Sequence, residues 1–235
     1  MSTGRVKFNG GSLNLLSQIF RRTFSDGWLI ISGPLPSIGD NSVERLLEIV
    51  NLSQPLLVIR SQGPPSIEIE QWALDLEALL EIPLNILDLD TVDDQILMTR
   101  WQEAGFVIVV AEDDYLALDS LIQRITVNQS ELTLDRDQIF WFVGAAGVIV
   151  GEWAYNASMD QILQGMGWLP GAIILNQPGG VVEIDPVQEI LHSRSRNYAL
   201  NLIGGATIAL APDGEVDLWG SPTPSIVLGQ GWGDL

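Results

Sequence analysis

The chain contains no cysteine among its 235 residues and only one histidine, His192. The absence of cysteine excludes disulfide bonds, thiolate metal sites and a cysteine nucleophile. His192 is followed by Ser193, but adjacent residues on a helix point in directions about 100° apart, so the two are poorly placed to share a proton. We therefore interpret His192 as a surface side chain near the end of a helix.

Basic residues are scarce as well, with 11 lysines and arginines against 30 acidic residues and a net charge of −19. Such a charge repels nucleic-acid phosphates and anionic lipids, so we expect no nucleic-acid partner. Residues 1–25 are the exception, because they contain four basic residues and no acidic one. This contrast predicts a separate role for the N-terminal segment.

We expect residues 1–25 to form a basic arm that docks on an acidic and partly apolar surface. The predicted contact residues are Arg5, Lys7, Phe20, Arg21 and Arg22. Two hosts stay open at this stage, a partner protein, which we favour, and the acidic body of the chain itself. A solvated tail is the third interpretation.

Long hydrophobic runs are also missing. The longest, residues 139–151, is ended by Glu152 and is shorter than the roughly 20 residues that a membrane span needs. The first residues do not show the apolar run and cleavage site of a secretory signal. We therefore expect a cytoplasmic protein without a membrane span.

Short β-branched runs alternate with amphipathic stretches, which predicts an α/β fold with a doubly wound, mostly parallel sheet and helices on both faces. We expect one domain over residues 26–235. The strands are expected at residues 28–32, 56–60, 84–89, 106–110 and 139–143. We expect Asn41 or Ser42 to cap one helix and Ser66 to cap another, and we expect two further helices near residues 92–103 and 115–125.

The pattern changes after Gly151, where we expect a short helix, a strand near residues 172–175 and a helix that begins at Pro186. Residues 207–210 and 216–219 flank a Pro-Asp-Gly sequence, which favours a tight turn. These last segments predict a small C-terminal β-hairpin extension of the sheet.

The segment most informative about function is residues 139–147. An apolar strand over 139–143 runs directly into Gly-Ala-Ala-Gly at 144–147, and an apolar stretch follows. A strand, a tight turn of small residues and a helix are the parts of a nucleophile elbow. We therefore expect Ala145 to lie at a strand-to-helix turn with its methyl group packed inside the domain.

On these residues the chain resembles the cyanophycinase and peptidase E family of serine peptidases, which have a class I glutamine amidotransferase-like fold. In that family the elbow reads Gly-Thr-Ser-Ala-Gly, so the resemblance implies that Ala145 stands where the catalytic serine belongs. It extends over most of residues 26–230, and includes the strand 105–110 and the Gly-Met-Gly-Trp-Leu-Pro sequence at 165–170. A methyl group has no lone pair with which to attack a carbonyl.

The resemblance implies that the other catalytic groups are missing too. The turn that supplies oxyanion donors in the family corresponds to Glu112, Asp113, Asp114 and Tyr115, where carboxylates would oppose a developing negative charge. The position of the catalytic histidine corresponds to Gln177 or a direct neighbour, none of which is a histidine. An acidic site for Mg²⁺ or Ca²⁺ at residues 112–114 lacks a spacing motif, so we interpret this loop as solvated.

The arginine cluster that helps the family to bind its substrates has no counterpart at the same spacing. Arg194 and Arg196 lie further along the chain, and they are the candidate ligand-binding residues. Several of the eight tryptophans are expected near the ends of elements or in loops, and an exposed cluster of them would mark a partner surface.

We therefore expect a non-catalytic protein that binds another protein as a scaffold or assembly factor, with no cofactor and no metal site. Association with a second copy of the chain stays open. One alternative is a weak peptidase that acts on β-aspartyl or Asp/Arg-rich peptides through a displaced nucleophile such as Ser158 or Ser193. The other is a sensor that binds a small molecule in the former active-site cleft.

Overall fold

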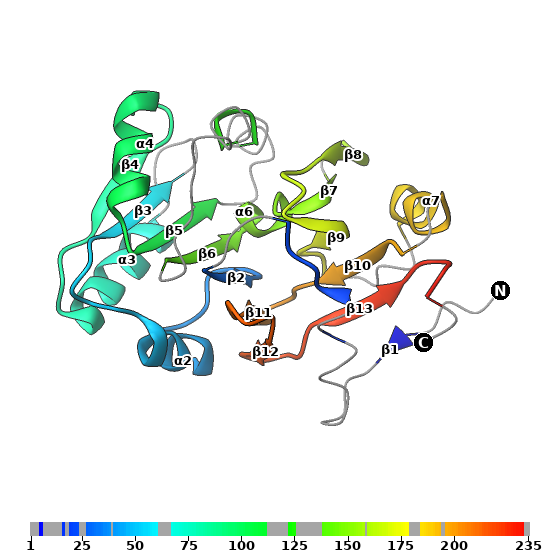
Figure 1. Cartoon of the computed structure of the whole chain (residues 1–235), viewed down its shortest axis with the longest axis horizontal. Coiled ribbons are helices and arrows are strands. Elements are labelled where there is room, and N and C mark those ends of the chain that lie inside the picture. Colours follow the sequence, from blue (N-terminus) through cyan, green and yellow to red (C-terminus); the bar gives the residue numbers. More distant parts are fainter. Residues whose placement is uncertain are drawn as a thin grey trace.

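The computed structural model describes residues 5–6, 16, 19–23, 27–38, 40–60, 67–111, 122–125, 138–157, 159–178, 184–193 and 196–232. Within these residues the chain folds into two β-sheets with helices packed on their faces (Figure 1). Several positions singled out above lie outside the described residues: Lys7, Ser66, Glu112, Asp113, Asp114, Tyr115, Ser158 and Arg194. Of the helix expected over residues 115–125, only residues 122–125 are described, and they are helical.

The first sheet has seven strands in the order β12-β11-β2-β6-β5-β3-β4. Their bounds are β2 Trp28–Ser32, β3 Leu56–Arg60, β4 Asn85–Asp88, β5 Phe106–Ala111, β6 Ile139–Gly144, β11 Thr207–Leu210 and β12 Val216–Trp219. Strands β2 to β6 are parallel, whereas β11 and β12 form an antiparallel hairpin beside β2. The expected α/β fold class and the expected hairpin are confirmed.

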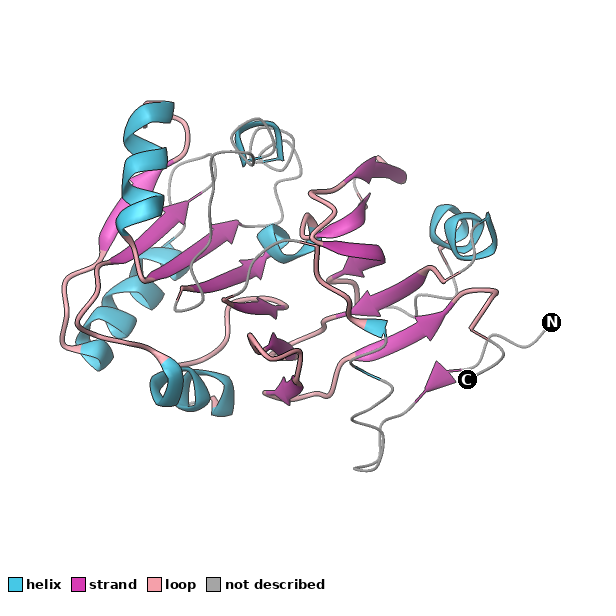
Figure 2. Ribbon diagram, viewed as in Figure 1, coloured by secondary structure: helices cyan, strands magenta, loops and turns pink. Residues whose placement is uncertain are grey.

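Helices cover both faces of this sheet (Figure 2). Helices α2 (Asn41–Ile49) and α3 (Ile67–Leu80) pack on one face, and α4 (Asp94–Glu103) packs on the other. Successive side chains of a strand point to opposite faces. On β6, Trp141 accordingly contacts Trp72 of α3, while Phe140 stacks on Trp101 of α4.

The helix starts differ slightly from expectation. Asp40, and not Asn41 or Ser42, is the N-cap of α2, and its carboxylate accepts a hydrogen bond from the Ser37 backbone N–H instead of from the helix. At α4 the carboxylate of Asp93 accepts a hydrogen bond from the N–H of Gln95, which caps the first turn.

The second sheet has six strands in the order β1-β13-β10-β9-β7-β8. Their bounds are β1 Arg5–Val6, β7 Gly151–Asn156, β8 Gln161–Gln164, β9 Leu169–Leu175, β10 Tyr198–Asn201 and β13 Ser225–Leu228. Helix α7 (Asp185–Ser193) packs on one face of this sheet through Val187 and Leu191. The C-terminal β-structure is thus much larger than the hairpin alone.

The expectation of a short helix after Gly151 was wrong, because residues 151–156 form β7. This strand pairs with β9 on one side and with β8 on the other. Pairing partners that lie up to 20 residues away decide the outcome, and a local apolar pattern does not contain that information. The helix expected after the elbow, α6 (Ala145–Val148), has only four residues, because the chain enters strand β7 at Gly151.

The two sheets share one hydrophobic core. Trp168, which precedes β9, makes edge-to-face contacts with Phe140 and Phe142 of β6, with ring centroids 6.0 and 5.3 Å apart. Phe20 of the N-terminal segment packs edge-to-face on Tyr198 of β10 at 5.4 Å. Side chains from both sheets and from the N-terminal segment therefore fill the same interior.

The described part of the N-terminal segment lies on the body of the protein. Leu16, Ile19 and Phe20 are buried in the shared core, and β1 pairs with β13. The N–H of Thr23 donates to the carbonyl of Trp168. Phe20, one of the predicted partner contacts, is only 4% exposed, because its side chain packs within the fold of this chain.

Candidate functional site

The turn between β6 and α6 has the geometry of a nucleophile elbow. Gly144 has φ 67° and ψ −136°, a conformation that essentially only glycine adopts. A Cβ atom at this position would lie 2.5 Å from the carbonyl oxygen of Ala111 at the end of β5. Ala145 begins α6 and is 2% exposed, which confirms the expected position of its methyl group.

Close packing explains why the elbow consists of small residues. A Cβ atom on Gly147 would lie 3.0 Å from the Ile31 side chain and 3.1 Å from the Ser32 carbonyl oxygen. The N–H of Gly144 donates a 2.8 Å hydrogen bond to the carbonyl of Gly33. The elbow is therefore fixed against β2, at the carboxyl ends of the parallel strands where α/β proteins place their active sites.

An amide side chain that follows β9 contacts the elbow. The Asn176 side-chain amide Nδ2 donates a 2.6 Å hydrogen bond to the carbonyl oxygen of Gly144. Asn201 holds the next residue, since its Oδ1 accepts from the N–H of Gln177 and its Nδ2 donates to the carbonyl of Gln177. The backbone of Gln177 is thus fixed next to Asn176, and the Asn176 amide that contacts the elbow is not a base at neutral pH.

Two hydroxyl groups near the centre of the first sheet, those of Ser32 and Thr207, hydrogen-bond to each other. Ser32 is fully buried, and its hydroxyl accepts a 2.7 Å hydrogen bond from Trp141 Nε1 and hydrogen-bonds to Thr207 at 2.8 Å. These contacts hold strands β2, β6 and β11 together. They leave Ser32 without access to a substrate.

His192 and Ser193 lie on α7, which packs on the second sheet away from the elbow. His192 Nδ1 hydrogen-bonds to the carbonyl of Gln188 at 2.7 Å, and the Ser193 hydroxyl donates to the carbonyl of Ile190 at 3.1 Å. Each side chain contacts its own helix and not the other. Within the described ranges, no group of three or more His, Asp or Glu side chains could hold a metal ion.

The tryptophans do not form the exposed cluster that would have marked a partner surface. Trp101, Trp168 and Trp219 are buried in the core, and Trp153 and Trp232 are half-buried. Their large apolar surface serves to fill the space between sheets and helices.

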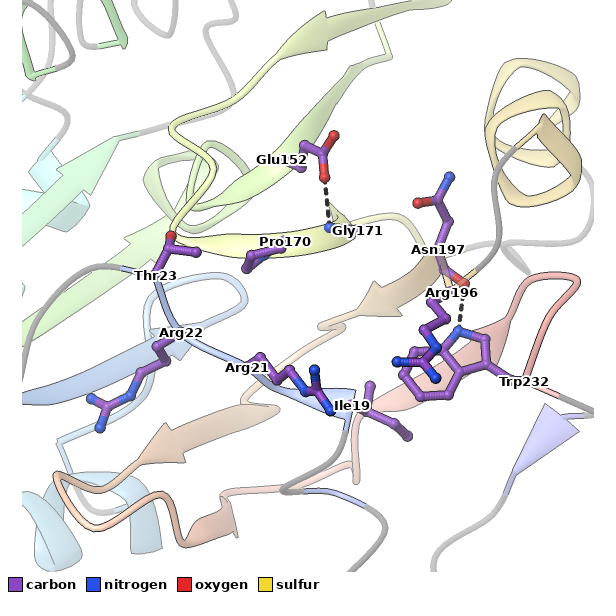
Figure 3. Close-up of a pocket in the computed structure, with 10 residues that line it drawn as sticks. All are labelled: Ile19, Arg21, Arg22, Thr23, Glu152, Pro170, Gly171, Arg196, Asn197 and Trp232. Carbon is purple, nitrogen blue, oxygen red and sulfur yellow. Dashed lines mark hydrogen bonds between the residues drawn. The ribbon is translucent and has the colours of Figure 1, made fainter. Parts of the chain in front are cut away.

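A cavity of about 510 Å³ opens in the second sheet, next to the N-terminal segment (Figure 3). Its walls come from five parts of the chain: the N-terminal segment, β7, the start of β9, the residues that follow α7, and the residues that follow β13. The lining residues are Ile19, Arg21, Arg22, Thr23, Glu152, Pro170, Gly171, Arg196, Asn197 and Trp232.

Three arginines and one glutamate line this cavity. Glu152 accepts a 2.8 Å hydrogen bond from the N–H of Gly171, and Arg22 donates to the carbonyl oxygens of Gly27 and Ala211. Arg21 and Arg196 are exposed, and among the described residues neither side chain has a hydrogen bond or an ion pair. The cavity wall is therefore positively charged in a strongly acidic protein.

The sequence singled out Arg21, Arg22 and Arg196 but assigned them to two different surfaces. The structure brings them to one cavity, because the N-terminal segment lies against β9 and β10. Glu152, Gly171, Asn197 and Trp232 had not been recognised as site residues. No local motif could have indicated them, since they become neighbours only through the pairing of β7, β9 and β10.

No protein-family model matches the chain, and no curated protein matches it. Solved structures do resemble it, and two of them are the following. A peptidase from an acI-B1 Actinobacterium superposes with a TM-score of 0.55 at 14% identity, over 88% of this chain and 92% of that one. A putative peptidase E protein from Listeria monocytogenes EGD-e superposes with a TM-score of 0.53 at 13% identity, over 83% and 99%. The fold is peptidase E-like.

At these identities the similarity shows the fold alone. The peptidase activity named for the two solved structures belongs to those proteins and is not transferred to this chain. The peptidase E-like fold agrees with the position of the elbow at the end of β6. Among the described residues no helix has the length and the apolar character that crossing a membrane requires.

Proposed function

We propose that this protein is a non-catalytic member of the peptidase E-like fold that binds another protein as a scaffold or assembly factor. The observation that carries the first half of this proposal is the buried methyl group of Ala145 at an elbow whose backbone geometry is intact. The turn holds the residue where a nucleophile would act, but the side chain has no atom that attacks a carbonyl.

The surroundings of Ala145 support the same interpretation. Asn176 and Gln177 stand beside the elbow, and the one histidine of the chain is on α7. A serine nucleophile needs a base within hydrogen-bond reach. The nucleophile and the base are both missing from the described site, so their loss points to a changed function and not to a single inactivating substitution.

Exposed apolar side chains support association with a protein. Six of the eight large apolar residues that are exposed in the described ranges come from α2, α3, β4 and their connections: Leu47, Leu52, Ile67, Leu74, Leu79 and Ile86. Ile67 and Leu74 are seven residues apart, so they lie on the same side of α3, where they are 84% and 60% exposed. Exposed apolar surface of this kind is typical of interaction sites.

The charge of α3 indicates which kind of partner would fit. The helix contains four acidic residues, Glu68, Glu70, Asp75 and Glu77, and no basic one. A complementary partner surface has an apolar centre for Ile67 and Leu74 and a basic rim for the carboxylates. The charges would contribute mainly to the rate of association, and the apolar contacts to the lifetime of the complex.

The alternative of a peptidase with a displaced nucleophile receives less support, because the Ser193 hydroxyl is bonded to its own helix. The alternative of a sensor in the former cleft receives less support too, since the Asn176 side chain is hydrogen-bonded to the Gly144 carbonyl, which a ligand at the elbow could otherwise contact.

Affinity purification of the tagged full chain from its native cells tests the proposed association. We expect a stoichiometric partner that is retained by Ile96→Asp and lost with Leu74→Asp. Both leucine-sized side chains are exposed on helices, at 52% and 60%, so the two variants introduce the same charge in similar settings. Equal retention by both variants, or the absence of a stoichiometric partner, would contradict the proposal.

A further inference from the structure

We propose that the cavity in Figure 3 binds a small organic anion, with its carboxylate or phosphate group held between Arg21 and Arg196 and its apolar body against Trp232. This inference does not depend on the protein partner proposed above. The cavity is also separate from the elbow. Residues at the start of β9 line the cavity, whereas the elbow contacts Asn176 at the end of β9. Gly171 and Gln177 are six residues apart, which is about 20 Å along an extended strand.

The charge of the cavity is the first reason. Three of the protein's 11 basic residues line it, although acidic residues outnumber basic ones by 30 to 11 in the whole chain. Like charges brought together repel each other, and this repulsion is relieved when an anion binds between them. Guanidinium groups are well suited to that task, because each offers paired donors to two oxygens of a carboxylate or phosphate.

The free donors of two arginines are the second reason. In the described part of the chain, Arg45, Arg60, Arg100 and Arg124 form ion pairs with carboxylates, and Arg22 donates to two backbone carbonyls. Arg21 and Arg196 are the two described arginine side chains without such a contact. They come from segments 175 positions apart in the chain and line the same cavity, so their donors are left for a ligand.

The backbone of Arg196 is the third reason. Its φ of 72° lies in the left-handed region, which is unfavourable for residues with a Cβ atom and favourable for glycine. An arginine here lowers the stability of the fold relative to a glycine. Residues held in such conformations are concentrated at ligand sites, where the side chain is needed at that place.

The remaining walls are fixed before any ligand arrives. Trp232 Nε1 donates a 3.1 Å hydrogen bond to the carbonyl of Asn197, and Asn197 Nδ2 donates a 2.8 Å bond to the carbonyl of Ile190. These bonds hold the indole ring at the side of the cavity and offer a flat apolar surface. A volume of about 510 Å³ suits a small metabolite-sized molecule.

Glu152 restricts the kind of anion. Its carboxylate is fixed in the wall by the N–H of Gly171 and would repel a second acidic group of the ligand. The cavity therefore favours a molecule with one acidic group at one end over a molecule with acidic groups at both ends.

Isothermal titration calorimetry with four probes tests this proposal. We expect benzoate or phenyl phosphate to bind, and the tighter of the two identifies the acidic group that the site prefers. Benzamide, which has the same flat ring without a charge, should not bind, and inorganic phosphate should bind more weakly than phenyl phosphate. No binding of benzoate or phenyl phosphate at concentrations up to about 10 mM would overturn the proposal.

Two variants connect the binding to the arginines. Arg21→Ala and Arg196→Gly should each weaken the binding of the better probe by about tenfold or more, whereas Arg45→Ala, which removes an exposed arginine elsewhere, should leave it unchanged. Arg196→Gly should also keep or raise the thermal midpoint, because glycine relieves the backbone strain. Unchanged binding in Arg21→Ala or Arg196→Gly would show that the anion binds elsewhere and would overturn the assignment.

Discussion

Asn176 Nδ2 lies 2.6 Å from the carbonyl oxygen of Gly144, so a residue of the second sheet is hydrogen-bonded to the elbow of the first. In a hydrolase this end of the sheet would be open to the substrate and to a catalytic base. Here an amide side chain occupies it and connects the elbow to the end of β9. The contact agrees with the proposal that this site has kept its structural role and lost its chemical one.

Asn176→Ala should lower the free energy of unfolding by about 1 kcal/mol, because the half-buried Gly144 carbonyl loses its donor. Asn176→Asp should lower it by more, since a carboxylate would face the carbonyl oxygen. Urea denaturation measures both. Asn51→Ala is the control, with an expected change below about 0.5 kcal/mol, because it removes an exposed amide whose oxygen accepts hydrogen bonds from Ser53.

Gly144→Ala should be among the most destabilising single-methyl changes in the protein. The new Cβ atom would lie 2.5 Å from the Ala111 carbonyl oxygen, in addition to the unfavourable φ. We expect a loss of about 3 kcal/mol. Gly214→Ala has a similar positive φ but no neighbour within 4 Å, so it should lose about 1 kcal/mol. Similar losses in the two variants would contradict the tight packing of the elbow.

The elbow could be predicted from the sequence because all of its information is local. A strand of apolar residues followed by Gly-Ala-Ala-Gly permits few structures, and Ala145 lies where that pattern placed it. The parallel strands of the first sheet and the terminal hairpin were predictable for the same reason. The strands β7 and β8 were not, since their partners are set by the tertiary fold.

Phe20→Ala should lower the free energy of unfolding by about 3 to 5 kcal/mol, because the ring is buried in the core that the two sheets share. Arg21→Ala, at the neighbouring exposed position, should change it by less than about 0.5 kcal/mol. Thermal or urea denaturation of the full chain measures both. A small effect of Phe20→Ala would mean that the N-terminal segment is not part of the fold.

The composition of the N-terminal segment could not decide whether the segment packs on the protein's own body or on a partner. Four positive charges and an amphipathic pattern predicted docking on an acidic surface, and the body of the protein and a partner were both suitable hosts. Leu16, Ile19 and Phe20 are buried in the protein's own core, so the body of the protein is the host of these apolar side chains. The destination of Arg21 could not be predicted, because the cavity exists only after the segment has packed.

Tyr198→Phe should raise the free energy of unfolding by about 1 kcal/mol, since the buried Tyr198 hydroxyl has no hydrogen-bond partner among the described residues. Burial also raises the pKa of Tyr198 far above its ordinary value. The unfolded chain releases this proton near pH 10 while the folded protein keeps it, so the stability from this group is complete below about pH 10 and is lost above it.

Unfolding free energies at pH 9 and 11 should therefore fall less in Tyr198→Phe than in the unchanged protein. Tyr155→Phe is the control, because that hydroxyl donates a 2.8 Å hydrogen bond to Asp160 and its removal should be destabilising. An equal alkaline loss in the Tyr198→Phe variant and the unchanged protein would show that Tyr198 is not responsible.

The absence of catalysis is the central claim, and hydrolysis of a β-aspartyl dipeptide by the unchanged protein tests it most directly. We expect no hydrolysis above the buffer rate, and no recovery in Ala145→Ser, because the side chain that contacts this turn in the described part of the chain is the amide of Asn176, which does not accept a proton from a serine. Stoichiometric labelling of the unchanged protein by a fluorophosphonate serine probe, together with hydrolysis that the label abolishes, would contradict the account.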